Sequence, residues 1–163
     1  MQCIDKVADG IYLGNAVTAR NENLLVDQGI THIISVGKGL VKHFPEKFSY
    51  KHIDIEDLPS VQIINYFQEC NEFIDSALEN HGRVYIHCYQ GISRSTTIAV
   101  AYLIYKKNLT AFRALKLIKK AHLEAAPNKG FLVQLENYEK LVFSKNLQLA
   151  QIKKSVGCNC NIF

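Results

Sequence analysis

The sequence lacks an apolar run long enough to cross a membrane, so we expect no transmembrane helix. Charged Asp5, Lys6 and Asp9 interrupt the first apolar residues, so we expect no secretory signal peptide. No arginine-rich tract and no basic helix with interleaved aromatics is present, which argues against a nucleic-acid partner. The five cysteines are irregularly spaced and do not suggest the disulfide framework of a small secreted protein. We therefore expect a reducing, cytoplasmic location.

The composition is that of an ordinary globular protein. Apolar residues make up 48% of the 163 residues and charged residues 21%, and the net charge is a mild +4. There are no internal repeats, low-complexity segments or linkers. We expect one folded domain over residues 1–150, followed by a flexible tail over residues 151–163.

Strand-like and helix-like segments alternate along the chain. β-prone apolar segments predict strands, and apolar residues at helical spacing predict the helices between and after them. The expected strands are 11–14, 31–36, 48–55 and 83–86. The expected helices are 21–28, 60–78, 96–107 and 130–150. Thr110 is expected to cap a further helix, in which Phe112, Leu115 and Ile118 face the core. The predicted class is α/β, a central sheet of four or five strands with helices on both faces.

Residues 87–95, His-Cys-Tyr-Gln-Gly-Ile-Ser-Arg-Ser, connect a predicted strand to a predicted helix. A short glycine-containing loop at this point directs several backbone N–H groups into one concavity, which suits a dianion such as phosphate. The same field favours the thiolate form of Cys88. Arg94 lies across the loop, where its planar fork suits two phosphoryl oxygens, and the Ser95 hydroxyl can stabilise a departing thiolate. The alternative is a buried structural cysteine in a strand–helix turn.

The pattern His-Cys-x5-Arg-Ser resembles the signature loop of cysteine-dependent protein tyrosine phosphatases, and its filling is similar to that of the dual-specificity branch. The resemblance implies hydrolysis of phosphomonoesters through a cysteinyl-phosphate intermediate, with no metal and no cofactor. It makes Cys88 the nucleophile and Arg94 the phosphate clamp. It also makes the whole loop the substrate-binding segment, namely Tyr89, Gln90, Gly91, Ile92, Ser93 and Arg94.

A phosphatase of this kind needs a carboxylic acid to protonate the leaving oxygen, held on a loop distant from the cysteine. Asp54, Glu56 and Asp57 are the candidates upstream of Cys88. Asp54 belongs to an alternating strand pattern, whereas Asp57 follows the strand and matches the position of the family's acid. We expect Asp57 to act first as acid and then as base, and a neighbouring carboxylate is the alternative.

Two further residues are expected to support the loop from outside the substrate pocket. His87 precedes the nucleophile on a strand, so its side chain points to the opposite face and should not reach the ester. We expect it to hold the loop and to stabilise the thiolate by hydrogen bonding, with plain core filling as the alternative. Asn128, in Pro-Asn-Lys-Gly-Phe, resembles the family residue that fixes the loop backbone.

The expected partners are phosphorylated proteins, and the sequence does not indicate an oligomeric state. The loop carries no lysine, which is unlike relatives that hydrolyse inositol phospholipids, and the short chain favours a shallow site for phosphoserine, phosphothreonine and phosphotyrosine. One rival interpretation is an inactive phosphopeptide-binding module, although such proteins usually lack the cysteine or the arginine. Another is a rhodanese-like or arsenate-reductase-like enzyme, which Asp57 and Ser95 disfavour.

The chain ends in Cys-Asn-Cys-Asn-Ile-Phe, with Cys160 fourth from the carboxyl terminus. This ending resembles a geranylgeranyl-type prenylation box, apart from the polar Asn161. Cys158 is a candidate for a second acyl chain, and two lipid chains anchor a protein where one binds only marginally. The alternatives are membrane association through this tail, or an unmodified polar tail on a cytosolic enzyme.

Overall fold

The computed structural model describes residues 3–157. Its centre is a five-stranded mixed sheet in the order β1-β2-β5-β3-β4. Strands β2, β5, β3 and β4 run parallel to one another. Strand β1 pairs antiparallel with β2 at one edge of the sheet. The strands are β1 (Ile4–Ala8), β2 (Ile11–Asn15), β3 (His32–Val36), β4 (Ser49–Ile53) and β5 (Val84–Cys88).

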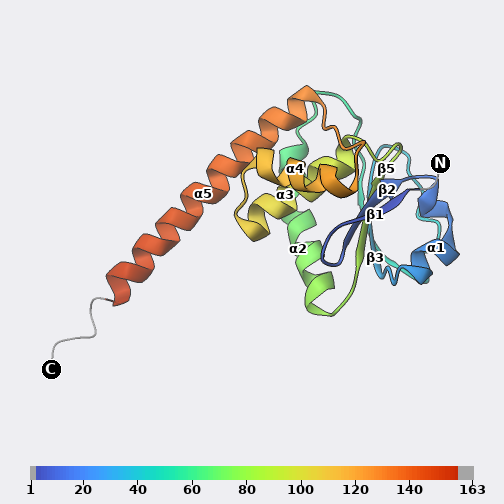
Figure 1. The fold of residues 1–163 in the computed structure, drawn as a ribbon, viewed down its shortest axis with the longest axis horizontal. Coiled ribbons are helices and arrows are strands. Elements are labelled where there is room, and N and C mark those ends of the chain that lie inside the picture. The colour runs from blue at the N-terminus through green and yellow to red at the C-terminus, as the bar shows by residue number, and fades with distance from the viewer. Residues whose placement is uncertain (1–2, 158–163) are drawn as a thin grey trace.

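Helices cover both faces of the sheet, as Figure 1 shows. The helical elements are η1 (Thr18–Arg20), α1 (Glu22–Asp27), η2 (Ile63–Tyr66), α2 (Phe67–Glu79), α3 (Arg94–Lys107), α4 (Ala111–Ala121) and α5 (Lys129–Gly157). Helices α2 to α5 gather on one face around the larger core cluster, and α1 lies over the smaller cluster on the other. The expected α/β class with helices on both faces is confirmed, with five strands.

Neighbouring residues of β5 alternate between the two core clusters, as the pleat of a strand requires. Val84 and Ile86 point into the larger cluster, whereas Tyr85 points into the smaller one. Because β5 is central and parallel to both neighbours, its carboxyl end opens at the edge where ligands bind in α/β sheets. The signature loop (residues 88–94) leaves the sheet at this edge and leads directly into α3.

The structure corrects several predicted element boundaries. Strand β1 was not predicted, and α3 begins at Arg94 rather than at residue 96 because the Ser93 carbonyl already accepts from the Thr97 N–H and hydroxyl. The predicted helix after Ser60 begins only at Ile63, and α5 extends past the expected end at residue 150 to Gly157, projecting from the body in Figure 1.

Long-range contacts with α5 account for the late start of the helix after Ser60. Gln134 on α5 accepts a hydrogen bond from the Ile64 N–H at 3.0 Å and donates to the Val61 carbonyl at 2.8 Å. These bonds hold Val61 and Ile64 in a turn that is not α-helical. A glutamine seventy residues later in the chain gives no local sign of this role.

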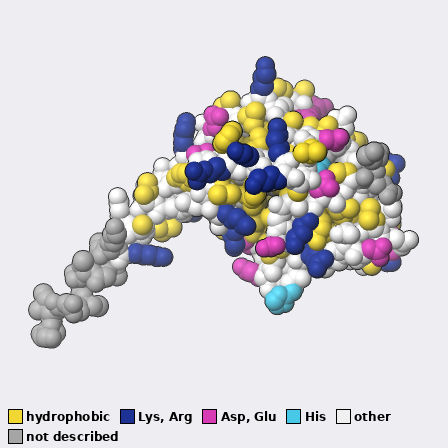
Figure 2. Space-filling model, viewed as in Figure 1, with side chains coloured by type: hydrophobic (Ala, Val, Ile, Leu, Met, Phe, Trp, Pro, Cys, Tyr) yellow, Lys and Arg dark blue, Asp and Glu magenta, His cyan; other side chains and the backbone are white. Residues whose placement is uncertain are grey.

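The buried face of α4 also differs from the prediction. Phe112 is 75% exposed, and the fully buried positions are instead Ala111, Ala114 and Ile118, with Leu115 half-buried. Small alanine side chains allow α4 to lie close to α3, so the buried stripe falls on alanines rather than on the phenylalanine. The lysines of α4 face outward and form part of the dark-blue group in the middle of Figure 2.

Candidate active site

The Cys88 thiol lies at the end of β5, 2% exposed, inside the curve of the signature loop. The Gly91 N–H donates to its Sγ at 3.2 Å, and the Ser95 Oγ lies 3.3 Å from the same sulfur. Both groups are placed to donate hydrogen bonds to a thiolate sulfur. The structure therefore brings Cys88 and Ser95 into direct contact, as the sequence predicted.

Gly91 is required at the turn of the loop for two reasons. Its φ of +80° lies in the left-handed region, and a Cβ at this position would come within 2.7 Å of the Gly14 carbonyl oxygen on β2. The backbone of the loop thus packs directly on the neighbouring strand. A side chain here would push the loop away from the sheet and displace the N–H that contacts Cys88.

Arg94 is the first residue of α3, and its guanidinium is buried beside the loop. One Nη donates to the Ile55 carbonyl at 3.1 Å, and the guanidinium carbon lies 5.4 Å from the centre of the Tyr89 ring. The buried Nε of Arg94 has no hydrogen-bond partner among residues 3–157. The Asp57 Oδ2 lies 3.8 Å from it, which is too far for a hydrogen bond. A buried cationic N–H without an acceptor is costly, which points to a ligand oxygen at this place.

Asp57 comes from the loop after β4, far from Cys88 in sequence, and the structure places it against the signature loop. Its Oδ1 accepts hydrogen bonds from the Ser93 hydroxyl and the Asn128 side-chain amide, both at 2.8 Å. Its side chain is 34% exposed. Asp54, the rival carboxylate, lies just beyond β4 and accepts from the Gly39 N–H at 3.1 Å. The structure thus ties Asp57, rather than Asp54, to the loop.

Asn128 contacts the side chain of a loop residue rather than the loop backbone. Its backbone N–H donates to the Ser93 Oγ at 3.0 Å, and its side-chain oxygen accepts from the Phe131 N–H at the start of α5. Since its amide also reaches Asp57, Asn128 joins the carboxylate, the loop and the helix start. The position matches its expected supporting place outside the substrate pocket.

His87 points to the opposite face from the pocket, as strand alternation predicted, and its ring stacks on Tyr85. Its Nδ1 lies 3.4 Å from the Cys88 carbonyl oxygen and its Nε2 lies 2.8 Å from the Ser35 Oγ. Burial lowers the pKa of His87 to about 4, so the ring is neutral at pH 7. Within the described part of the chain, His87 contacts the loop at the Cys88 backbone and not at the sulfur.

The buried neutral His87 makes folding stability fall with acidification. The unfolded chain binds a proton at this residue below pH of about 6.5, whereas the folded protein resists it until about pH 4. The unfolded state therefore binds more protons in this window, and the free energy of unfolding decreases by up to about 1.4 kcal/mol per pH unit as pH falls. Urea unfolding of His87→Asn between pH 7 and 4.5 should show a shallower slope than the wild type.

The matched control is His81→Asn, a change at an exposed histidine after α2. It should leave the pH dependence of the unfolding free energy parallel to that of the wild type. A His87→Asn protein with the same slope as the wild type would show that His87 protonates alike in both states.

The outer mouth of the site is formed by Tyr89 and Gln90, both exposed. The Tyr89 hydroxyl donates to the Lys38 carbonyl at 2.7 Å, so the ring is held at the rim beside Arg94. Gly91 and Ser93 are buried and Ile92 is half-buried. The predicted substrate-binding loop thus has an exposed rim and a buried floor.

The rear of the signature loop rests on the segment between α4 and α5, where the sequence pointed to Asn128 but not to His122 or Ala126. The Ala126 N–H donates to the Ile92 carbonyl at 2.9 Å, and the His122 Nε2 lies 2.7 Å from the Gly91 carbonyl. His122 in turn lies 2.7 Å from the Asp5 carboxylate on β1. The only sequence signal for this role is a lone histidine just after a helix, which is too common to be informative.

Cys3, Asp5 and His122 bring atoms of metal-binding type within 4.8 Å of one another. These short distances are explained by hydrogen bonds. The Cys3 thiol donates to the Asp5 carboxylate at 3.0 Å, and the His122 Nδ1 lies 2.7 Å from the same carboxylate. Burial, followed by the Asp5 contact, raises the pKa of Cys3 to about 12. The thiol is therefore protonated at neutral pH, and metal binding would have to remove that proton.

Cys70, on α2, is fully buried in the core as expected.

The parallel sheet, the loop after its central strand and the cysteine–arginine pair define the class of cysteine-dependent phosphatases. The family model of the dual specificity phosphatase catalytic domain matches residues 11–141. The chain is 36% identical over 139 residues to dual specificity protein phosphatase 1B of Arabidopsis thaliana, covering 85% of this chain and 83% of that protein. It belongs to the dual-specificity phosphatase family, as a small atypical member, and is a protein phosphatase.

Two solved structures extend the likeness to three dimensions. The crystal structure of DUSP15 is 37% identical and superposes with a TM-score of 0.77, covering 85% of this chain and 88% of that one. The human tyrosine phosphatase-like serine/threonine/tyrosine-interacting protein is 30% identical with a TM-score of 0.85, covering 88% of this chain and 99% of that one.

Among the described residues, no helix is both long and apolar enough to cross a membrane.

Proposed function

We propose that this phosphatase hydrolyses phosphotyrosine and phosphoserine or phosphothreonine in proteins through a cysteinyl-phosphate intermediate. The observation that carries the proposal is the buried Arg94 Nε, which has no acceptor among residues 3–157, at the end of the loop that begins with a thiol accepting from Gly91. A phosphoryl oxygen would satisfy that N–H and bring phosphorus towards the Cys88 sulfur. Arg94 would then clamp the oxygens while the thiolate attacks.

Asp57 would protonate the leaving oxygen and afterwards activate water for hydrolysis of the cysteinyl phosphate. Ser93 and Asn128 both donate to one oxygen of its carboxyl group, which leaves Oδ2 on the side of Arg94. Ser95, 3.3 Å from the sulfur, would donate to the thiolate as it leaves in this second step. The proposed role of each residue thus follows from the atom it presents to the loop.

Asp57→Asn tests the acid–base assignment. We expect kcat for a phosphopeptide to fall by roughly 10²–10⁴-fold, because the amide can neither give nor take the proton. The loss should be smaller for p-nitrophenyl phosphate, whose leaving group needs little protonation, and the basic limb of the pH profile should disappear. Steady-state kinetics with both substrates measures this difference.

Asp54→Asn is the matched control, since Asp54 lies three residues earlier and its described contacts are with the Gly39 N–H and the His52 ring, away from the signature loop. It should keep kcat within a few-fold of the wild type. A larger loss in Asp54→Asn than in Asp57→Asn would transfer the acid–base role to Asp54. Activity on p-nitrophenyl phosphate that depends on a metal rather than on Cys88 would instead support a different chemistry.

The shape of the rim supports a broad choice of phosphorylated residue. Tyr89 is 48% exposed at the rim, whereas Cys88 is 2% exposed. A shallow mouth lets the short side chains of phosphoserine and phosphothreonine bring phosphorus to the sulfur, and phosphotyrosine can also enter. Relative kcat/KM values on matched phosphopeptides report this selectivity.

We further propose that the carboxyl-terminal tail carries a lipid anchor at Cys160, with Cys158 as a second acylation site. Both residues lie outside the described residues, so the support is the sequence of the tail alone. Mass spectrometry of the protein from its native cell should show Cys160 prenylated and the last three residues removed. An intact, unmodified terminus at Phe163 would leave the enzyme cytosolic without an anchor.

A further inference from the structure

His122 lies behind the signature loop with both ring nitrogens facing oxygens. The ring is 2% exposed, its Nε2 is 2.7 Å from the Gly91 carbonyl and its Nδ1 is 2.7 Å from the Asp5 Oδ2. A carbonyl oxygen and an ionised carboxylate can only accept hydrogen bonds. Two short contacts to two acceptors therefore require an N–H on each ring nitrogen, which is the imidazolium form.

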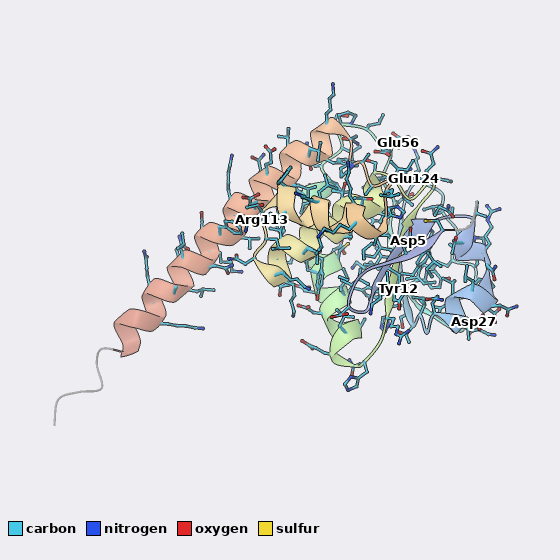
Figure 3. All side chains as sticks on the ribbon, in the orientation of Figure 1. Asp5, Tyr12, Asp27, Glu56, Arg113 and Glu124 are labelled. Carbon is cyan, nitrogen blue, oxygen red and sulfur yellow. The ribbon has the colours of Figure 1, made fainter. Side chains whose placement is uncertain are left out.

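The groups around the ring carry a negative or partial negative charge. His122 is the C-cap of α4, where the partial negative charge of the helix end stabilises a cation. Asp5 supplies a direct counter-charge, and Glu124 lies close enough to act electrostatically on the neighbouring Cys3. Figure 3 shows Asp5 and Glu124 on the same part of the molecule.

The remaining titratable group at the ring is the Cys3 thiol, 3.6 Å from Nδ1. It donates to the Asp5 Oδ2 at 3.0 Å and stays protonated at neutral pH, so it adds no charge of its own. The carboxylate thus accepts from the thiol and from the ring together. This leaves a buried cation, His122, paired with one partly exposed anion, Asp5.

The contact with Gly91 controls the direction of a backbone donor. The peptide bond from Gly91 to Ile92 is trans, so the Ile92 N–H points opposite to the Gly91 carbonyl. Because His122 holds that carbonyl at the rear, the Ile92 N–H faces the inside of the loop. The next peptide repeats the arrangement, since Ala126 holds the Ile92 carbonyl and turns the Ser93 N–H the same way.

A charged donor on the carbonyl also strengthens the N–H on the other side of the same peptide. Hydrogen bonds polarise one another along a chain, and a bond from an ionised donor is about twice as strong as a neutral one. The His122 ring thus acts on the phosphate site through the Gly91–Ile92 peptide, without contacting the ligand. Its pairing with Asp5 orients the ring for this contact.

We propose that His122 is a buried imidazolium that positions the signature loop, directing the Ile92 N–H at the phosphoryl oxygens from behind while Asp5 holds it in place. The proposal rests on the loop being the phosphoryl site, as set out under Proposed function. His122 is a positioning residue, because it acts through the Gly91–Ile92 peptide.

The protonation of the ring can be read directly by ¹⁵N NMR of the histidine-labelled wild-type protein at pH 7. Both nitrogens of His122 should carry protons, with a coupling from each nitrogen to its own hydrogen. Assignment uses the loss of these signals in His122→Gln. A single protonated nitrogen, with the other accepting from a neutral Asp5, would overturn the proposal whatever the enzyme's activity.

The effect on the loop is measured as the inhibition constant of orthovanadate at pH 7. His122→Gln and Asp5→Asn should each weaken vanadate binding about tenfold, the size of one charge-assisted hydrogen bond. Asp9→Asn, a fully exposed carboxylate just after the same strand, should leave it unchanged. Vanadate binding in Asp5→Asn as tight as in the wild type would contradict positioning by the pair.

The variants also separate this proposal from the phosphatase mechanism. A role in stability alone would lower the thermal midpoint of Asp5→Asn and leave its vanadate constant unchanged, which counts against positioning. If His122→Gln does not fold, the assignment of the ring signals is lost and the vanadate constant of Asp5→Asn decides the matter. Failure of the wild type to bind vanadate would instead remove the proposed phosphoryl site, without bearing on the ring protons.

Discussion

Cys88→Ser is expected to lower kcat/KM for any phosphomonoester by at least about 10³-fold, because a serine hydroxyl is not ionised at neutral pH. The sulfur is 2% exposed and accepts from the Gly91 N–H at 3.2 Å. An oxygen in its place would stay protonated, and that proton blocks attack on phosphorus. Steady-state turnover of p-nitrophenyl phosphate measures the loss.

The fold should tolerate this change, since serine is close to cysteine in size and the Ser95 hydroxyl can hydrogen-bond the new oxygen. Circular dichroism and a thermal midpoint within a few degrees of the wild type would show that only the chemistry is lost. Cys70→Ser is a useful comparison, because Cys70 is a fully buried core residue on α2, remote from the loop in sequence. Retention of a tenth of the wild-type turnover in Cys88→Ser would rule out Cys88 as the nucleophile.

Arg94→Lys should be nearly as damaging, with a loss of kcat/KM of roughly 10²–10⁴-fold. An ammonium is a point charge on a different stem and cannot give two parallel N–H bonds to one phosphoryl group. Two bonds from a charged donor are each worth about 1.5–3 kcal/mol, which sets the scale of the loss. The change would also leave the Ile55 carbonyl without its present donor at 3.1 Å.

Arg113→Lys is the matched control, an exposed arginine on the outer face of α4 that Figure 3 labels. It should leave both turnover and vanadate inhibition at wild-type values. If Arg94→Lys keeps full affinity for vanadate, the clamp must be supplied by the loop N–H groups alone. A change in the stability of Arg94→Lys, by contrast, reports the lost contacts with the Tyr89 ring and the Ile55 carbonyl.

Local patterns were enough to predict the parts of the site that lie close together in the chain. Cys88, Arg94 and Ser95 occupy one strand–loop–helix unit, so the predicted order of strand, loop and helix was enough to expect them close together before any contact was known. The same alternation placed His87 on the far face. Asp57 was chosen as the candidate acid from three carboxylates in one short segment, because it follows the strand and matches the position of the family's acid.

The rest depends on contacts between distant segments that leave no local pattern. The Asp5–His122 pair joins β1 to the end of α4, and its role exists only because both lie behind Gly91. The buried face of α4 follows from how closely α3 approaches, which hydrophobicity alone misjudged at Phe112. The turn that leads into η2 is held by Gln134 in α5. None of these could be read from the spacing of apolar residues.

The most direct test of the proposed mechanism is to trap the covalent intermediate. Asp57→Asn should hydrolyse the phosphoenzyme slowly, so rapid acid quench with p-nitrophenyl phosphate should leave phosphate on the enzyme. Peptide mass spectrometry should then find one phosphate, on Cys88, and none in Cys88→Ser. Phosphate on another residue, or a burst of p-nitrophenol with no phosphate on Cys88, would contradict the cysteinyl-phosphate mechanism.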